Sequence, residues 1–252
     1  MNLKDIIKSL RNSEHYSIRL IYYFLKPFWL ARRFITDAYY RSAVITGLRS
    51  GNKYYQRSSF TKTDRYPVVF AACAHYLQSN SHPHILSFGC ATGEEAATLG
   101  KYLPGAMIAG TDINEWCIRT CRNSYNDNKR LRFFNRHSDE FNNCGGFDAI
   151  FCMAVFQNTA NRLNKNNETA KYLTFSQFEE ELKALDAKLN NGGLLVTDNC
   201  DFSFTDTAIA VHYKPLVFPD NLIERDRPLF DRNNRKIAET QHIYRVFVKD
   251  GK

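Results

Sequence analysis

Short apolar runs alternate with longer amphipathic stretches over residues 67–200, a pattern typical of buried strands that alternate with helices. The apolar runs are Ile85–Phe88, Met107–Thr111, Leu131–Phe134, Phe147–Cys152 and Leu194–Thr197. The stretches that predict helices are residues 67–79, Glu94–Tyr102, Glu115–Asn123 and Leu182–Leu189, the last followed by a stop at Asn190–Gly193. This repeated order predicts a doubly wound α/β fold.

Two more strands are expected near the C-terminus, at residues 209–213 and 241–248, with a hairpin turn at Arg232–Arg235 between them. They would complete a mostly parallel, seven-stranded Rossmann-like sheet with helices on both faces. Residues 67–252 therefore read as one domain, and residues 1–66 as a basic, aromatic helical extension or lid.

The charge of the chain changes this picture only at the N-terminus. The formal net charge is +8, and residues 1–60 alone hold 11 Lys/Arg against 3 Asp/Glu. Residues 18–30 are apolar and aromatic but include Arg19, Lys26 and Pro27, and the run is too short to span a bilayer. The segment suits an anionic membrane surface, although a lid or a dimer contact would have the same composition.

The first apolar strand is followed by a glycine-rich turn at the start of a helix, in the order Gly89-Cys90-Ala91-Thr92-Gly93-Glu94. Glycine lets a ligand approach the backbone, and the helix N-terminus offers free N–H groups to an anion. The dinucleotide fingerprint G-x-G-x-x-G is absent. Asp112 ends the second strand, about 20 residues further on, where a carboxylate accepts from ribose hydroxyls. Its structural alternative is the N-cap of the next helix.

This loop resembles motif I of the class I S-adenosylmethionine-dependent methyltransferases, and its residues look especially like those of the chemotaxis-receptor glutamate methyltransferases. The resemblance implies that S-adenosylmethionine binds here and leaves as S-adenosylhomocysteine. It also implies a cofactor role for Ile113 beside Asp112, for Ser138 and Asp139 after the third strand, and for Met153 and Ala154 after the fourth. Gln56, Thr61 and Arg65 would face the methionine end of the cofactor or the substrate.

The acceptor is less clearly marked. Met153 and Ala154 stand where base methyltransferases often carry Asp/Asn-Pro-Pro-aromatic, which counts against a nucleic-acid acceptor. Methyl transfer to a hydroxyl needs a general base, whereas transfer to a carboxylate does not. The candidate bases are His212, Tyr213, Asp198 and His137, each of which also has a structural explanation.

We therefore expect O-methylation of a glycan, a glycolipid or another small acceptor, with two alternatives. One is protein carboxyl methylation, and the other is a catalytically silent binding module or membrane adaptor. Asp198 and Asn199 resemble half of the metal site of catechol-type methyltransferases, but a second carboxylate has no counterpart, so no metal is expected.

Seven cysteines with no secretory signal predict reduced thiols in a cytoplasmic protein, peripheral at the membrane if the N-terminus docks there. The oligomeric state is left open.

Overall fold

The computed structural model describes residues 3–51, 56, 59, 61–159, 161, 170, 172–225 and 227–251. The chain divides into two compact units, residues 1–45 and residues 46–252. This division falls earlier than the boundary at residue 66 that the sequence suggested. The two units are treated separately.

The first unit is helical and contains α1 (Leu3–Arg11), α2 (Tyr16–Thr36) and the beginning of α3 (Ala38–Ser50). Helix α1 packs on α2, and Ile7 is buried. Helix α2 ends where Asp37 accepts a hydrogen bond from the Tyr40 backbone N–H at 2.8 Å and pairs with Arg33 at 3.2 Å. Among the helices that the structure describes, none is both long and apolar enough to cross a membrane.

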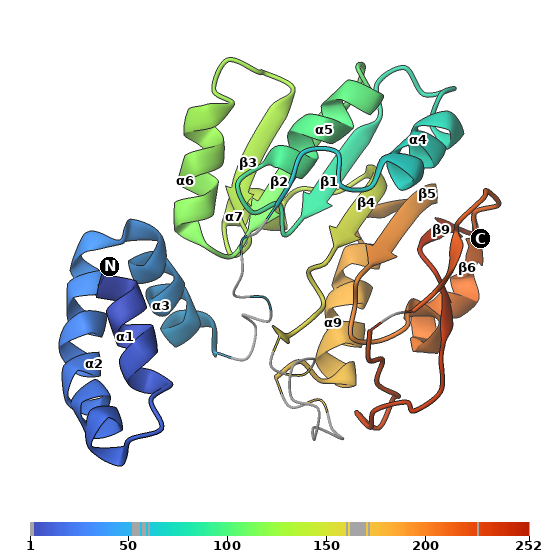
Figure 1. Ribbon diagram of the computed structural model, residues 1–252. Coiled ribbons are helices and arrows are strands. Elements are labelled where there is room, and N and C mark those ends of the chain that lie inside the picture. The colour runs from blue at the N-terminus through green and yellow to red at the C-terminus, as the bar shows by residue number, and fades with distance from the viewer. Residues whose placement is uncertain are drawn as a thin grey trace. The chain divides into compact units, whose positions relative to one another are not determined.

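The second unit is built on a seven-stranded sheet of order β3-β2-β1-β4-β5-β9-β6 (Figure 1). Its strands are β1 (His84–Phe88), β2 (Met107–Asp112), β3 (Leu131–Asn135), β4 (Phe147–Met153), β5 (Leu189–Asp198), β6 (Tyr213–Pro215) and β9 (Val246–Lys249). Strands β1 to β5 are parallel, and β9 pairs antiparallel with both β5 and β6. The expected Rossmann-like sheet is confirmed.

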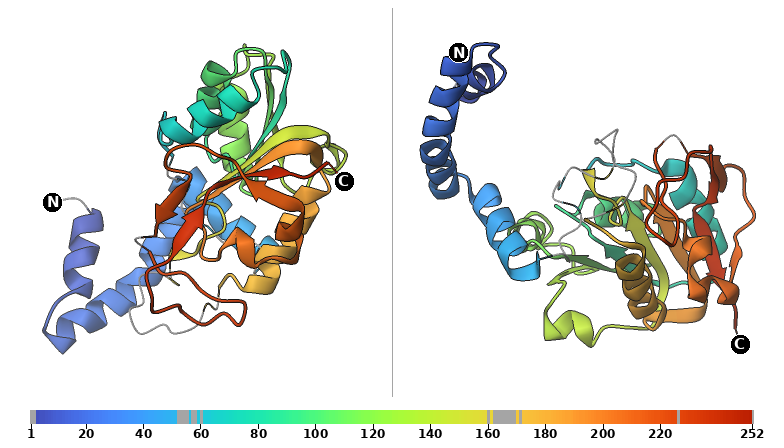
Figure 2. Two further views of the ribbon diagram at one scale, coloured as in Figure 1. Left: turned by 90° about the vertical axis from the view of Figure 1, so that its right-hand side faces the viewer. Right: turned by 90° about the horizontal axis from the view of Figure 1, so that it is seen from below.

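The strands bury both of their faces, because neighbouring residues point to opposite sides of a sheet. Along β4, Ala149 and Phe151 join one hydrophobic cluster, whereas Ile150 and Cys152 join the other. The first cluster includes residues of α4 (Pro67–Tyr76), α5 (Glu94–Tyr102) and α6 (Glu115–Ser124). The second includes residues of α7 (Asp139–Asn142) and α9 (Phe175–Asp186). The helices therefore cover both faces of the sheet, as Figure 2 shows from two further directions.

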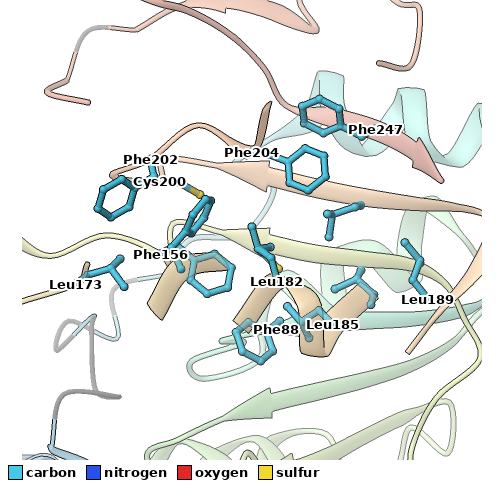
Figure 3. Close-up of a cluster of buried hydrophobic side chains, with 14 of the residues drawn as sticks. Phe88, Phe156, Leu173, Leu182, Leu185, Leu189, Cys200, Phe202, Phe204 and Phe247 are labelled. Atoms are coloured by element: carbon cyan, nitrogen blue, oxygen red, sulfur yellow. The ribbon is translucent and has the colours of Figure 1, made fainter. Parts of the chain in front are cut away.

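The cluster beneath α9 is rich in aromatic rings (Figure 3). Phe156 stacks on Phe88 with ring centroids 5.7 Å apart and meets Phe178 edge-on at 5.3 Å. Phe156 follows the end of β4, and Phe88 is the last residue of β1. This packing therefore fixes the chain beside the carboxyl ends of the two central strands, where β1 and β4 lie next to each other.

The C-terminal elements differ from those expected. Residues 209–213 lie mostly in a 3-10 helix, Ala208–His212, and the strand begins at Tyr213. The run 241–248 is divided between β8 (His242–Tyr244), which pairs with β7 (Leu222–Glu224) in a separate small sheet, and β9. Apolar residues stand on both sides of Arg245, so the pattern alone does not show where one strand ends and the next begins. The predicted hairpin turn is confirmed, since Phe230 pairs with Lys236.

The helix predicted at residues 182–189 was also wrong at its end. Helix α9 stops at Asp186, and β5 already begins at Leu189. The pair Gly192 and Gly193 lies inside β5, where the pairing with β4 shifts register between Phe147 and Ala149. A glycine pair after a helical pattern is typical of a C-cap, but here it belongs to a strand irregularity.

Candidate active site

The glycine turn leaves β1 in a conformation that favours glycine. Gly89 has φ +74 and Gly93 has φ +95, and Ala91 between them has φ +49. The Gly89 and Cys90 backbone N–H groups donate to the Thr111 carbonyl of β2, at 2.7 and 2.9 Å. A Cβ on Gly89 would lie 2.4 Å from Val155 Cγ2, so glycine is also required by the close approach of the chain after β4.

The side chain of Asp112 is hydrogen-bonded to the backbone of this turn. Its carboxylate accepts the Ala91 backbone N–H at 3.1 Å and the Asn114 backbone N–H at 2.8 Å. The N-cap of α6 is Asn114 and not Asp112. The Asn114 side chain accepts a hydrogen bond from the Trp116 backbone N–H. Burial raises the pKa of Asp112 to about 6, against the opposing effect of the backbone hydrogen bonds. Above that pH, Asp112 presents a charged acceptor.

The carboxyl ends of β4 and β5 form the adjoining wall. Ala154 follows β4 with φ +61, and Asn199 follows β5 with φ +54, both unusual for residues with a side chain. The Ala154 N–H donates to the Asp198 carbonyl at 2.8 Å, and its carbonyl accepts from the Gln157 side chain at 2.8 Å. These bonds hold a strained backbone in place, a feature that clusters at functional sites.

A cavity of about 280 Å³ lies over these strand ends. The loops after β1, β2, β3 and β4 contribute to its walls, together with the segment that precedes α4. Its lining from the strand ends comprises Phe88, Gly89, Cys90, Ala91, Thr111, Asp112, Ile113, Arg136, His137, Met153, Ala154, Val155, Gln157 and Thr159. The remaining lining residues are Gln56, Ser59, Thr61, Lys62, Arg65, Tyr66, Phe70, Glu95, Glu181 and Arg227. Strand order reverses at β1 and β4, which is where ligands bind in open α/β sheets.

Glu95 and Tyr66 are ionisable groups in the wall with shifted pKa values. Burial raises the pKa of Glu95 to about 8, although the Ser87 hydroxyl donates to its carboxylate at 2.7 Å. Glu95 is therefore protonated at neutral pH. Burial also raises the pKa of Tyr66 to about 12, and its phenol oxygen accepts from the Asn199 side chain at 3.2 Å. Both groups thus enter the cavity as uncharged hydrogen-bonding side chains.

Arg136 lies directly after the end of β3, and its side chain is held by several contacts. Its guanidinium lies 2.5 Å from the Glu181 carboxylate of α9 and over the rings of Phe88 and Phe141, at 5.0 and 5.2 Å from their centroids. Both partners of the ion pair are mostly buried. The pair joins α9 to the loop after β3 at the edge of the cavity.

The structure brings together most of the cofactor residues predicted from the sequence. Gly89, Cys90, Ala91, Asp112, Ile113, Met153, Ala154 and Arg65 all line the cavity, as do Gln56 and Thr61. Thr92, Gly93, Glu94, Ser138 and Asp139 are not among its lining residues. Thr92 donates to Glu94 at 2.7 Å, and Ser138 caps α7 by accepting from the Phe141 N–H. The cofactor roles of all these residues, lining or not, stay predictions.

The four candidate bases are separated in the fold. His137 lines the cavity, whereas His212, Tyr213 and Asp198 are not among its lining residues. The Tyr213 hydroxyl donates to Asp186 at 2.6 Å, and His212 is exposed at the end of a 3-10 helix. Asp198 is buried, and its carboxylate lies 3.8 Å from the Arg245 guanidinium. In the described part of the chain, no cluster of three His, Cys, Asp or Glu side chains could hold a metal.

Sequence reasoning missed Arg136, Glu95, Glu181, Gln157 and Arg227 as lining residues. Arg136 immediately precedes His137 at the end of a predicted strand, and this position could have identified it as a lining residue. Glu181 lies 45 positions further along the chain, in the middle of a helix, and only the packing of α9 on the sheet brings it to Arg136.

The cysteines behave as expected of structural thiols. All seven are free, and six of them are buried. Cys121 donates to the Ala91 carbonyl at 3.2 Å and so packs under the glycine turn. Burial raises the pKa of Cys73 and Cys200 well above the ordinary value, which keeps these thiols protonated and unreactive.

Comparison with known proteins gives one family match. Residues 86–195 match the model of a family described as a methyltransferase domain. The match begins in β1, ends in β5, and includes the glycine turn and Asp112. No protein of the curated set matches the chain.

Among solved structures, three examples show the extent of the likeness. The plantazolicin methyltransferase BpumL in complex with SAH is 17% identical, with 67% of this chain and 56% of that chain covered and a TM-score of 0.37. PKMT2 from Rickettsia typhi in complex with AdoHcy is 16% identical, with 52% and 24% covered and a TM-score of 0.38. The precorrin-6y C5,15-methyltransferase from Geobacter metallireducens GS-15 is 12% identical, with 75% and 94% covered and a TM-score of 0.41.

The chain thus spans about a quarter of PKMT2 and just over half of BpumL. At these identities and TM-scores, the likeness gives no information about substrate or mechanism. The specific likeness to chemotaxis-receptor methyltransferases is not shown by any of these comparisons.

Proposed function

We propose that this protein, whose residues 86–195 are a methyltransferase domain, transfers the methyl group of S-adenosylmethionine to an oxygen of a glycan, a glycolipid or another small acceptor. The observation that carries the proposal is the cavity at the switch point of the sheet, with the glycine turn as its floor and the Asp112 carboxylate at its edge. Both features are needed to bind a nucleoside with a charged tail, and the domain match covers both.

The residues present fit this cofactor. Gly89 leaves room for the Val155 side chain to pack against the turn, and both residues line the cavity where the cofactor would lie. Asp112 uses each carboxylate oxygen for one backbone N–H, which leaves acceptor capacity on both oxygens for ribose hydroxyls. Arg65 lines the same cavity and supplies a positive charge for the carboxylate at the methionine end.

The bound cofactor would supply an electrophilic methyl group on a sulfonium, and the protein's task is to align a nucleophile with it. The new bond forms between the acceptor oxygen and the methyl carbon, the carbon–sulfur bond breaks, and its electron pair stays on sulfur. The hydroxyl proton needs an acceptor. Among the four candidate bases, His137 is the one that lines the cavity, so we assign the proton to its imidazole.

Three features support the acceptor class. The Asp/Asn-Pro-Pro-aromatic motif of base methyltransferases is replaced here by Met153-Ala154-Val155-Phe156. The first three of these residues line the cavity with small or apolar side chains. The cavity also offers Gln157 and Thr159, whose side chains hydrogen-bond to hydroxyl groups. The basic, apolar N-terminal unit favours an acceptor that is found at a membrane surface.

The test is isothermal titration of the purified full-length chain with S-adenosylhomocysteine. We expect micromolar or tighter binding, about 8 kcal/mol of binding free energy. Binding would then justify a screen of glycan, glycolipid and small hydroxyl acceptors with radiolabelled cofactor. No detectable binding would overturn the enzymatic proposal and leave a methyltransferase fold that serves as a binding module.

A further inference from the structure

Helix α2 presents an apolar stripe that nothing in the described part of the first unit covers. Leu20, Phe24, Phe28 and Ile35 recur at intervals of four and seven residues, so they lie along one face of the helix. Phe24, Phe28 and Ile35 are 71%, 66% and 73% exposed. Ala31 continues the stripe, and no residue of α2 is buried. A face of this composition normally packs in a core, so an exposed one marks an interaction site.

The charges of α2 are all positive. Arg19, Lys26 and Arg33 recur every seven residues and therefore form a second stripe, on the side of the helix away from Phe24 and Phe28. No Asp or Glu occurs from Tyr16 to Thr36. Lys26 and Arg33 extend along the helix over the rings of Tyr22 and Trp29, at 5.9 and 5.7 Å from the centroids. The charged groups of these two side chains thus lie over aromatic rings of the same helix, as in cation–π contacts.

This combination distinguishes between partners. A second copy of the chain packed on the same stripe would cover the exposed rings, but it would bring no acidic residue of α2 to the cations on the opposite side of the helix. An anionic lipid surface supplies both an apolar layer for the exposed rings and negative headgroups for the Lys and Arg side chains. The helix is not apolar enough to cross a bilayer, which leaves an orientation in the plane of the surface.

We propose that α2 binds the protein to anionic membranes by lying in the interfacial plane, with Leu20, Phe24, Phe28 and Ile35 inserted among the lipid chains. This binding is independent of the methyl-transfer proposal, because it needs no ligand in the cavity. It makes α2 the membrane-binding element of the chain, with Arg19, Lys26 and Arg33 on the polar face of the helix, within the layer of charged headgroups.

The experiment is flotation of the full-length chain with phosphatidylcholine vesicles, with and without phosphatidylglycerol. We expect flotation with the anionic vesicles and its loss at high salt. The triple variant Phe24→Ser/Phe28→Ser/Ile35→Ser should stay at the bottom of the gradient. The variant Arg19→Gln/Lys26→Gln should bind anionic vesicles on the order of 30-fold more weakly, because each cation near such a surface contributes roughly one kilocalorie per mole.

A matched control removes exposed apolar side chains elsewhere. Leu48, Val211 and Val217 are also highly exposed, and their triple serine variant should float like the wild type. Unchanged circular dichroism and S-adenosylhomocysteine binding would show that the α2 variants still fold. Three results would overturn the proposal: no flotation of the wild type, equal flotation with neutral vesicles, or a stable dimer that only the α2 triple variant converts to a monomer.

Discussion

Asp112 offers the sharpest test of the site, because its observed structural role and its proposed ligand-binding role can be separated. Asp112→Ala removes a charged acceptor from the edge of the cavity. Hydrogen bonds to a charged group contribute about 1.5–3 kcal/mol each, so the loss of two ribose contacts should cost at least about 3 kcal/mol. That energy corresponds to a loss of S-adenosylhomocysteine affinity of roughly 100-fold or more.

The structural task has its own control. Asp112 accepts the backbone N–H groups of Ala91 and Asn114, so its removal also loosens the glycine turn. Asn114→Ala removes the N-cap of α6 and should cost about 1 kcal/mol of stability without changing the affinity for S-adenosylhomocysteine. Calorimetric titration and thermal unfolding of both variants therefore separate loss of the ligand contact from loss of local order.

The pH dependence provides a second readout for Asp112. Its folded pKa is raised to about 6, so the carboxylate is charged above that pH and protonated below it. Affinity for S-adenosylhomocysteine should therefore fall as the pH decreases below about 6, by up to tenfold per unit for a single proton. Asp112→Asn should abolish this dependence. If Asp112→Ala bound S-adenosylhomocysteine within about threefold of the wild type, the assignment of Asp112 to ribose would be refuted.

Three further predictions concern other residues of the site. Gly89→Ala should lower stability by about 1–3 kcal/mol more than Gly192→Ala, because both glycines have φ near +75 but only Gly89 has Val155 at 2.4 Å; equal melting temperatures would contradict this. The raised pKa of Glu95 favours the protonated form in the folded state. Relative to Glu95→Gln, the unfolding free energy of the wild type should therefore fall by about 1.4 kcal/mol per pH unit between pH 4.5 and about 8 and should not change further above pH 8. Parallel curves of unfolding free energy against pH would disprove this prediction. His137→Ala should lower turnover of an identified hydroxyl acceptor with little change in cofactor affinity, whereas Tyr213→Phe should cost stability alone, and the reverse result in a turnover assay would move the base to Tyr213.

The central sheet was predictable because its strands are buried on both faces. Runs such as Ile85–Phe88 and Phe147–Cys152 have no polar alternation, and their spacing with helices admits few topologies. The strands near the C-terminus are short: β9 and β6 are the last two of the large sheet, and β7 and β8 lie outside it. There, tertiary pairing decides the structure, as at Arg245 between β8 and β9.

Part of the cavity lining was predictable for a related reason. Gly89 follows β1 and Asp112 ends β2, and the carboxyl ends of parallel strands meet at one edge. The opposite wall comes from residues without such a marker. Glu181 is one of several Glu residues in α9, and sequence periodicity places it on a helix face without indicating that this face reaches Arg136. This wall of the cavity is therefore the part that a single sequence identifies least well.

Helices α9 and α2 show why the same pattern has opposite outcomes. In α9, Phe175, Phe178, Leu182 and Leu185 follow the spacing of an apolar stripe, and all four are buried against the sheet. The stripe of α2 has the same kind of spacing, yet it is exposed. The polar face of α9 mixes Glu with Lys, as expected for a helix whose partner is its own domain, whereas α2 carries only cations. Both helices carry an apolar stripe but differ in charge, and a purely cationic helix is completed by a partner that is negative and apolar at once.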